Sequence, residues 1–159
     1  MTKGTLTVIV VSAKGLKNAD DVGKSDPYVR LWLDDVDSQR TTTKVVEAKK
    51  LTDVDLFGKS DPYVKLVLSD NKSQSTTIKK GELNPKYNEE FNFVTDGEKE
   101  LKVEVWDRNT IGSDELIGSE VIPLAKVYES GFLDTWIKIK SSHSKRSQGE
   151  CHIILEFAY

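Results

Sequence analysis

The heptapeptide Gly-Lys-Ser-Asp-Pro-Tyr-Val fills residues 58–64, and the same seven residues stand at 23–29, an offset of 35. The similarity continues in the same register on both sides of the heptapeptide. Within each copy two aspartates lie six residues apart, Asp55 and Asp61 in one and Asp20 and Asp26 in the other. Only two copies exist and residues 81–159 show no trace of the repeat, so the pattern does not predict a solenoid.

Composition and charge place the chain among globular proteins. Its 159 residues suffice for one domain with its own core, and 37% of them are apolar while 31% are charged. A net charge of −3 argues against nucleic acid as a partner. Cys151 is the only cysteine, which excludes an internal disulfide and favours a reducing compartment. With no apolar run of membrane-spanning or signal-peptide length, we expect a cytoplasmic protein.

Short apolar stretches alternate with turn residues along the whole chain. Most of them show the alternation of a half-buried antiparallel strand, which predicts an all-β sandwich or barrel. The expected strands are residues 6–11, 28–33, 63–68, 90–94, 101–106, 135–139 and 151–157. A short helix is expected around residues 124–128, and the polar, basic residues 141–149 predict an exposed loop.

Two oxygen-rich loops point to a calcium site. Calcium takes six to eight oxygen ligands, and residues 55–61 place a carboxylate on each side of a turn at Gly58. A second such loop follows a predicted strand, and its candidate ligands are Asp107, Asn109, Asp114 and Glu115. Residues 20–26 have the same design as residues 55–61, so Asp20 and Asp26 are alternative ligands. The ligand spacing of an EF-hand is absent.

At this point the residues resemble the C2 domain family. The resemblance is carried by Asp-x5-Asp-Pro-Tyr-Val at 55–64, Leu-Asn-Pro-Lys-Tyr-Asn-Glu-Glu-Phe at 83–91, Trp-Asp-x-Asn at 106–109 and Asp-Glu-Leu-Ile-Gly at 114–118. It covers residues 40–159 as one nearly complete domain, and residues 5–46 resemble the opening third of a second. Residues 149–157 resemble the closing strand of the circular variant called type II, found in tricalbins, extended synaptotagmins and plant membrane-tethering proteins.

The resemblance implies a fold, a cofactor and a partner. The fold would be an eight-stranded antiparallel sandwich that binds Ca²⁺ between its apical loops and then docks on anionic phospholipid. Asp55, Asp61 and Asp107 match ligand positions of the family directly. Asn109 stands where the family often has aspartate, so one negative charge is lost. Glu115 matches the last ligand position by its distance to Gly118, while Asp114 matches common family usage, and both stay open.

Membrane contacts follow from the same resemblance. Once calcium has cancelled the loop carboxylates, apolar loop tips would enter the membrane interface. The candidate tip residues are Leu56, Phe57 and Ile111, with a core position as the alternative for Phe57. Lipid head groups would meet a basic strip on neighbouring strands, made of Lys65, Lys79, Lys80 and Lys86. The alternative is that these lysines are ordinary solubilising residues.

The extra copy leaves the first strand of the domain ambiguous. We expect residues 1–39 to be a partial repeat within the same folded unit, produced by a crossover between tandem domains or by an engineered duplication. Residues 41–46 can fill the first strand position, or the more apolar residues 6–11 can fill it while about 35 residues loop out. Exchange of strands between molecules is the third alternative, so we expect a monomer or a strand-swapped dimer. We expect residues 55–61 to supply the calcium loop, because they continue directly into the rest of the domain.

These features predict a calcium-dependent, peripheral module that binds anionic phospholipid membranes. The alternative is a calcium-independent interaction domain or structural scaffold. An enzyme is not expected, because His143 and His152 lack cysteine partners at zinc spacing and neither lies beside a recognisable nucleophile motif.

Overall fold

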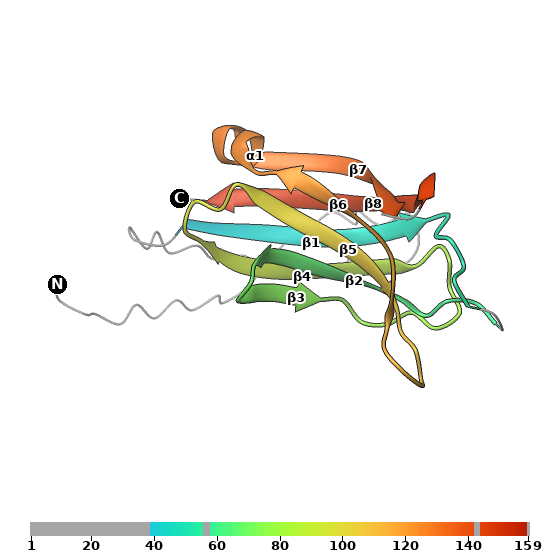
Figure 1. Ribbon diagram of the computed structural model, residues 1–159. Coiled ribbons are helices and arrows are strands. Elements are labelled where there is room, and N and C mark those ends of the chain that lie inside the picture. Colours follow the sequence, from blue (N-terminus) through green and yellow to red (C-terminus); the bar gives the residue numbers. More distant parts are fainter. Residues whose placement is uncertain (1–38, 56–57, 142–143, 159) are drawn as a thin grey trace, which may run out of the picture. The chain divides into compact units, whose positions relative to one another are not determined.

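The structure, a computed structural model, describes residues 39–55, 58–141 and 144–158 (Figure 1). The chain divides into two compact units, Met1–Asp34 and Asp35–Tyr159, and the described residues belong to the second unit. The expected strands at 6–11 and 28–33 lie outside the described residues, as do Asp20, Asp26, Leu56 and Phe57.

Eight antiparallel strands and one short helix make up the described unit, as the all-β prediction required. The strands are β1 (Gln39–Lys49), β2 (Pro62–Ser69), β3 (Lys72–Ser75), β4 (Lys86–Thr95), β5 (Glu100–Asp107), β6 (Glu115–Pro123), β7 (Phe132–Ser141) and β8 (Ser144–Ala158), and the helix is α1 (Ala125–Ser130). Their order is β3-β2-β5-β6-β7-β8-β1-β4. The expected eight-stranded antiparallel fold is confirmed.

The sheet folds into two layers between β6 and β7 (Figure 1). These two strands share one residue pair, Ser119 opposite Lys140, whereas their other neighbours are paired along most of their length. Gly118 permits the close approach, because a β-carbon there would lie 2.6 Å from the carbonyl oxygen of Lys140. The two four-stranded halves therefore face each other across one core.

Alternating side chains from both halves fill the core. Along β2 every second residue is buried, including Val64 and Leu66, and β8 contributes Ile153 and Leu155 from the other half. Burying each such side chain stabilises the fold by about 1.5–3 kcal/mol before the cost of ordering the chain. Cys151 is also fully buried, as expected for a small packed residue.

Most predicted elements are found near their expected positions. Residues 63–68, 90–94, 101–106, 135–139 and 151–157 lie in β2, β4, β5, β7 and β8 respectively, and the helix begins one residue later than expected. The prediction of an exposed loop at 141–149 was wrong, because β8 already begins at Ser144 and pairs with β7. Gln148 and Gly149 are buried in this extension of the hairpin.

Residues 39–49 occupy the first strand position in this structure. As β1, they pair with β4 on one side and with β8 on the other, with an irregularity between Val45 and Glu47. Of the alternatives left open by the repeat, the described fold therefore shows the one with residues 41–46 in the sheet. Thr41 and Thr43 are buried there among apolar neighbours.

Three connections gather at one end of the sandwich, on the right in Figure 1. They join β1 to β2 through residues 50–61, β3 to β4 through residues 76–85, and β5 to β6 through residues 108–114. Both oxygen-rich loops predicted from the sequence belong to this group. The fold thus brings together residues that are about fifty positions apart in the chain.

Candidate functional site

Asp53 closes the base of the β1–β2 connection. Its Oδ1 atom accepts hydrogen bonds from the backbone N–H of Ser60 at 3.1 Å, the hydroxyl of Ser60 at 3.2 Å and the N–H of Asp55 at 3.3 Å. The Ser60 hydroxyl oxygen also accepts the N–H of Val54 at 3.0 Å. The sequence reading missed this role of Asp53 and Ser60, although an aspartate bonding the N–H two residues ahead is a recognised turn pattern.

Asp107 is the buried centre of the loop end. It is the last residue of β5 and is only 1% exposed. Its Oδ1 atom accepts the backbone N–H of Asp61 at 2.7 Å, whereas its Oδ2 atom is buried with no hydrogen-bond partner. Burial raises the pKa of Asp107, and the nearby carboxylates of Asp55 and Asp61 raise it further, although the N–H of Asp61 and the hydroxyl of Ser60 partly offset this increase. Asp107, at the end of β5, is thus close enough to two carboxylates of the β1–β2 connection to be repelled by both.

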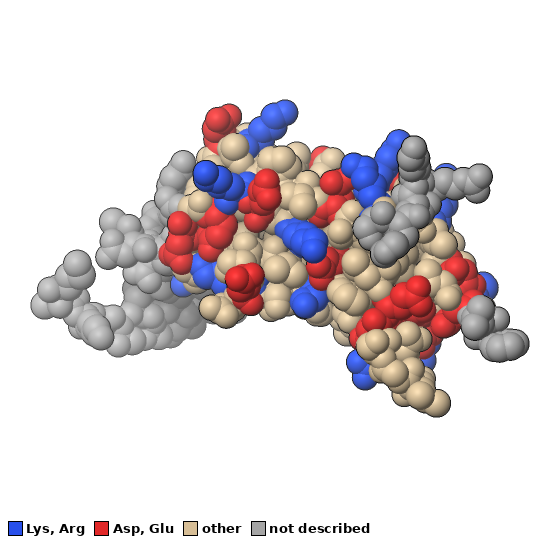
Figure 2. All heavy atoms as spheres, viewed as in Figure 1, with Lys and Arg blue, Asp and Glu red and all other residues tan. Residues whose placement is uncertain are grey.

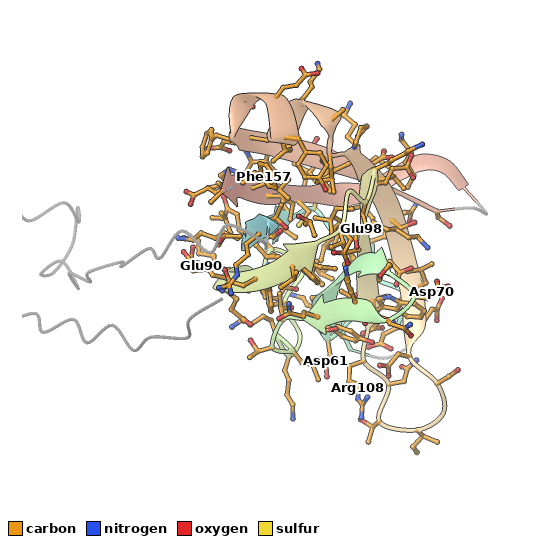
Figure 3. All side chains as sticks on the ribbon, turned by 90° about the vertical axis from the view of Figure 1, so that its left-hand side faces the viewer. Asp61, Asp70, Glu90, Glu98, Arg108 and Phe157 are labelled. Atoms are coloured by element: carbon orange, nitrogen blue, oxygen red, sulfur yellow. The ribbon has the colours of Figure 1, made fainter. Side chains whose placement is uncertain are left out.

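Asp61 links all three connections. Its Oδ1 atom accepts the N–H of Gly81 in the β3–β4 connection at 2.7 Å, and its carbonyl oxygen accepts the N–H of Arg108 at 3.1 Å. Figure 3 shows Asp61 and Arg108 at the same end of the molecule. Gly81 has a φ of 62°, in the left-handed region that glycine adopts most readily. One side-chain oxygen of Asp61, Oδ1, therefore already accepts a hydrogen bond, from the N–H of Gly81.

Asp114, the last residue of the β5–β6 connection, accepts hydrogen bonds from three donors. Asp114 accepts a hydrogen bond from the hydroxyl of Tyr63 at 2.8 Å, lies 3.4 Å from the guanidinium of Arg108, and accepts the N–H of Asn109 at 3.2 Å. The Tyr63 hydrogen bond in particular lowers the pKa of Asp114. Burial, and then Asp114 itself, raises the pKa of Tyr63 to about 12. Asp114 is thus committed to Tyr63 and Arg108.

Glu115 lies directly opposite Asp107 in the register of β5 and β6. Side chains of directly opposed residues project from the same face of a sheet, with β-carbons about 5 Å apart. Glu115 therefore shares a face with Asp107, although Glu115 is exposed where Asp107 is buried. Asn109 is half-buried, and its amide nitrogen donates to the carbonyl oxygen of Ser113 at 3.0 Å.

The tip of the β5–β6 connection is uncharged and prominent. Ile111 is 92% exposed, which makes it the most exposed large apolar side chain in the described part of the chain. Figure 2 shows acidic side chains gathered at this end beside the uncharged tip. The other two expected tip residues, Leu56 and Phe57, fall outside the described residues.

The four candidate head-group lysines are divided between two places. Lys65 lies on the outer face of β2, opposite Glu104, and lines a hollow of about 400 Å³. The other residues around this hollow are Tyr63, Trp106, Arg108, Gly112, Ser113 and Asp114. Lys79 and Lys80 lie in the β3–β4 connection and Lys86 begins β4. Lys79 lies 4.0 Å from Glu89. Two of the four lysines therefore lie in a connection and two on strands.

The donor atoms fit a hard cation, although they are not gathered around one point. Within the described ranges, no three histidine, cysteine, aspartate or glutamate side chains form a group that could hold a metal ion as they stand. Asp61 accepts a hydrogen bond from Gly81, and Asp114 accepts one from Tyr63. These bonds help to explain why the carboxylates do not converge on one point. The unpartnered, buried oxygen of Asp107 is nevertheless the kind of atom that a calcium ion satisfies.

No helix in the described part of the chain is long and apolar enough to cross a membrane. The helix α1 has only six residues.

Comparison with known proteins establishes the family. A sequence model of the C2 domain matches residues 4–46 and, separately, residues 40–139. The chain therefore belongs to the C2 domain family, and the expected resemblance is confirmed. The two matches share residues 40–46, the same residues that could be read as belonging to either copy of the repeat.

Related proteins come from plants and from animals. Over 138 residues the chain is 38% identical to Synaptotagmin-4 of Arabidopsis thaliana, a match that covers 86% of this chain and 18% of that protein. Over 132 residues it is 34% identical to 16 kDa phloem protein 2 of Arabidopsis thaliana, covering 82% of this chain and 66% of that protein. The chain thus spans less than two thirds of these curated relatives.

Solved structures agree with the fold. C2 domain A of plant Extended Synaptotagmin 1 superposes with a TM-score of 0.66 at 30% identity. The match covers 74% of this chain and 92% of that one. The calcium-bound pair of C2 domains, A and B, of Extended-Synaptotagmin 2 gives a TM-score of 0.64 at 28% identity, covering 74% of this chain and 45% of that one. The fold is therefore similar to C2 domains of extended synaptotagmins, at 28–30% sequence identity.

Proposed function

We propose that this chain is a calcium-dependent module that binds anionic phospholipid membranes from the cytoplasm without catalysing a reaction. The observation that carries the proposal is the buried carboxylate of Asp107, whose Oδ2 atom has no partner and whose neighbours are two further carboxylates. Such an arrangement is costly without a cation, because like charges and a bare buried oxygen both destabilise the fold.

Residues in and beside two connections would hold the calcium ion. Asp55 and Asp61 would contribute from the β1–β2 connection, Asp107 from the end of β5, Asn109 from the β5–β6 connection and Glu115 from the start of β6. Asp114 is assigned a supporting role instead, since it is held by Tyr63 and Arg108. Bound calcium supplies positive charge that offsets the repulsion between the carboxylates and attracts phosphate oxygens of lipid.

The membrane would meet the uncharged loop tip and the cations beside it. Ile111 would enter the interface together with Leu56 and Phe57, since burial of an exposed aliphatic side chain is favourable. Lys65 and Arg108 line the hollow next to this tip and would contact head-group phosphates. Lys79, Lys80 and Lys86 would add weaker attraction from the β3–β4 side of the same end. The proposed localisation is therefore cytoplasmic and peripheral to a membrane.

Thermal melting with calcium or with a chelator tests the cation directly. Millimolar calcium is expected to raise the melting temperature of the chain, because a ligand that binds only the folded state stabilises it. The double variant Asp61→Asn/Asp107→Asn should lose this increase. Asp70→Asn is the matched control, since Asp70 follows β2 at the end opposite to Asp61 and is exposed. No calcium-dependent shift in the unmodified chain would contradict the proposal.

Sedimentation with phosphatidylserine liposomes tests the partner. We expect the chain and the Asp70→Asn control to pellet with these liposomes in calcium and to stay in solution with chelator. Liposomes of phosphatidylcholine alone should bind much less, because the bridging ion needs an anionic surface. Pelleting that is unchanged by chelator would overturn calcium dependence but leave lipid binding in place.

A calcium-independent interaction module is the second candidate function. It is favoured by Asn109, which removes one negative charge, and by the present engagement of Asp61 with Gly81. The same two experiments separate the candidates, since this alternative predicts identical melting and identical partner binding with calcium and with chelator.

A further inference from the structure

Ser60 carries a buried hydroxyl near the end of the β1–β2 connection. It is 0% exposed and directly precedes Asp61, whose backbone N–H donates to Asp107 Oδ1 at 2.7 Å. The hydroxyl oxygen of Ser60 already accepts the N–H of Val54 at 3.0 Å. A hydroxyl has a single proton to donate, so only one carboxylate can receive it at a time. The acceptor of this proton is therefore a choice made by the surrounding residues.

Two carboxylates compete for the Ser60 proton. In the structure the hydroxyl donates to Asp53 Oδ1 at 3.2 Å. It is also close enough to Asp107 to lower the pKa of that carboxyl. While the proton points to Asp53, Asp107 Oδ2 has no hydrogen-bond partner among the described residues. Donation to Asp107 instead would relieve this carboxyl, because a buried polar group without enough partners is destabilising.

The surroundings of Asp53 favour it as the acceptor. Its Oδ1 atom receives the backbone N–H of Ser60 at 3.1 Å and that of Asp55 at 3.3 Å, in addition to the Ser60 hydroxyl. The two backbone donors hold the carboxylate beside Ser60. Asp53 is exposed whereas Asp107 is only 1% exposed, so the Asp53 carboxylate keeps much more of its hydration.

We propose that Asp53 is a positioning residue of the calcium site, which holds the proton of the Ser60 hydroxyl and thereby keeps the buried Asp107 carboxylate open for a cation. The inference rests on the proposed calcium function. Asp53 acts through Ser60 and does not itself contact the ion. Without Asp53 the hydroxyl turns to Asp107, and calcium must then displace a hydrogen bond to a charged acceptor before it binds there.

Calcium titration calorimetry on four variants tests this role. Asp53→Ala should weaken calcium binding about tenfold, because a hydrogen bond to a charged group now opposes the ion. Asp53→Asn should stay within about threefold of the unmodified chain, since its amide oxygen still accepts the same donors. Ser60→Ala should bind calcium about as tightly as the unmodified chain. The double variant Asp53→Ala/Ser60→Ala should regain most of the loss, because no hydroxyl is left to turn.

The same variants separate positioning from two other roles of Asp53. If Asp53 only supported the shape of the loop, the double variant would bind calcium as weakly as Asp53→Ala or more weakly, and the proposal would be overturned. If Asp53 contacted the ion or acted through its charge, Asp53→Asn would lose as much affinity as Asp53→Ala, which would also overturn it. Asp70→Ala is the matched control, because Asp70 is exposed and follows β2 at the opposite end.

Chemical denaturation in chelator tests the position of the proton without calcium. Ser60→Ala should lower the denaturation midpoint more in the Asp53→Ala background than in the unmodified chain, because there the hydroxyl relieves buried Asp107. Two residues that merely support each other give the opposite order, since the second loss costs less once the first partner is gone. That opposite order would overturn the proposal.

The two experiments also distinguish failure of this inference from failure of the proposed function. If the unmodified chain binds no calcium, the proposed function fails, and the comparison in chelator still decides whether Asp53 keeps the Ser60 proton from Asp107. If the unmodified chain binds calcium but the double variant regains no affinity, the proposed function stands and the role of Asp53 is refuted.

Discussion

Two buried side-chain oxygens in the described part of the chain lack a hydrogen-bond partner, and their surroundings differ. Asp107 Oδ2 lies at the loop end, where Asp55 and Asp61 are close and three connections meet. Thr43 Oγ1 lies within β1, opposite Phe91 and Leu155. The first oxygen has neighbours that can share a cation with it, and the second has only apolar side chains opposite it.

The different surroundings of these two oxygens lead to different interpretations of an unsatisfied buried group. A carboxylate among carboxylates at a loop end indicates a ligand, because one cation relieves the desolvation and the repulsion together. A hydroxyl in an apolar strand position indicates a poor match between a segment and its slot, since no small ligand could reach it. We therefore expect calcium to stabilise the first region and a change of residue to stabilise the second.

The largest expected effect is a difference in calcium affinity between variants of two adjacent acids, Glu115 and Asp114. Glu115→Gln should weaken calcium binding about tenfold, because it removes a charge from the face that carries Asp107. Asp114→Asn should change calcium affinity less and should mainly loosen the contact with Tyr63. Calcium titration calorimetry on both variants measures this, and equal losses of affinity would contradict the assignment.

The next effect concerns the unpartnered hydroxyl in β1. Thr43→Val should raise the free energy of unfolding by about 1 kcal/mol, because it removes a buried polar atom and keeps the β-branched shape. Chemical denaturation measures the change. Thr42→Val is the control, since the Thr42 hydroxyl already donates to Asn92 Oδ1 at 2.9 Å and should yield no gain. A destabilised Thr43→Val variant would mean that the hydroxyl has a partner after all.

A smaller effect should appear in the pH dependence of stability. The raised pKa of Asp107 means that the folded protein binds a proton there more readily than the unfolded chain does. Its contribution to stability therefore grows as the pH falls through the raised pKa towards the ordinary value of 3.8, and is lost as the pH rises. In chelator, the unfolding free energy of the unmodified chain minus that of Asp107→Asn should increase from about pH 7 to about pH 4. A constant difference would contradict the raised pKa.

The smallest expected effect on stability is at the loop tip. Ile111→Ser should change the free energy of unfolding by less than about 0.5 kcal/mol, because the side chain is 92% exposed. It should nevertheless reduce calcium-dependent binding to phosphatidylserine liposomes about tenfold, since it removes an apolar group from the interface. Val94→Ser is the control, because Val94 is 49% exposed on β4 and should not affect liposome binding.

Local patterns in the sequence were enough to predict the strands and the two loops. The alternation in residues 63–68 and 101–106 follows from one face of each strand being buried, and that pattern is local. The aspartates of residues 55–61 and 105–115 could be recognised because they flank turns between such strands. The extension of β8 to Ser144 could not be recognised, because its residues are polar and their strand conformation depends on pairing with β7.

The sequence by itself determined the fold class, the family resemblance and the residue types available for calcium. Only the tertiary structure decided which of two adjacent acids lies opposite Asp107 in the strand register, and which segment fills the first strand position in the described fold. Both decisions depend on register between strands that are distant in the chain, and a shift of one residue moves a side chain to the opposite face of the sheet. The repeat made the second decision ambiguous in sequence, because both copies carry a segment with strand alternation.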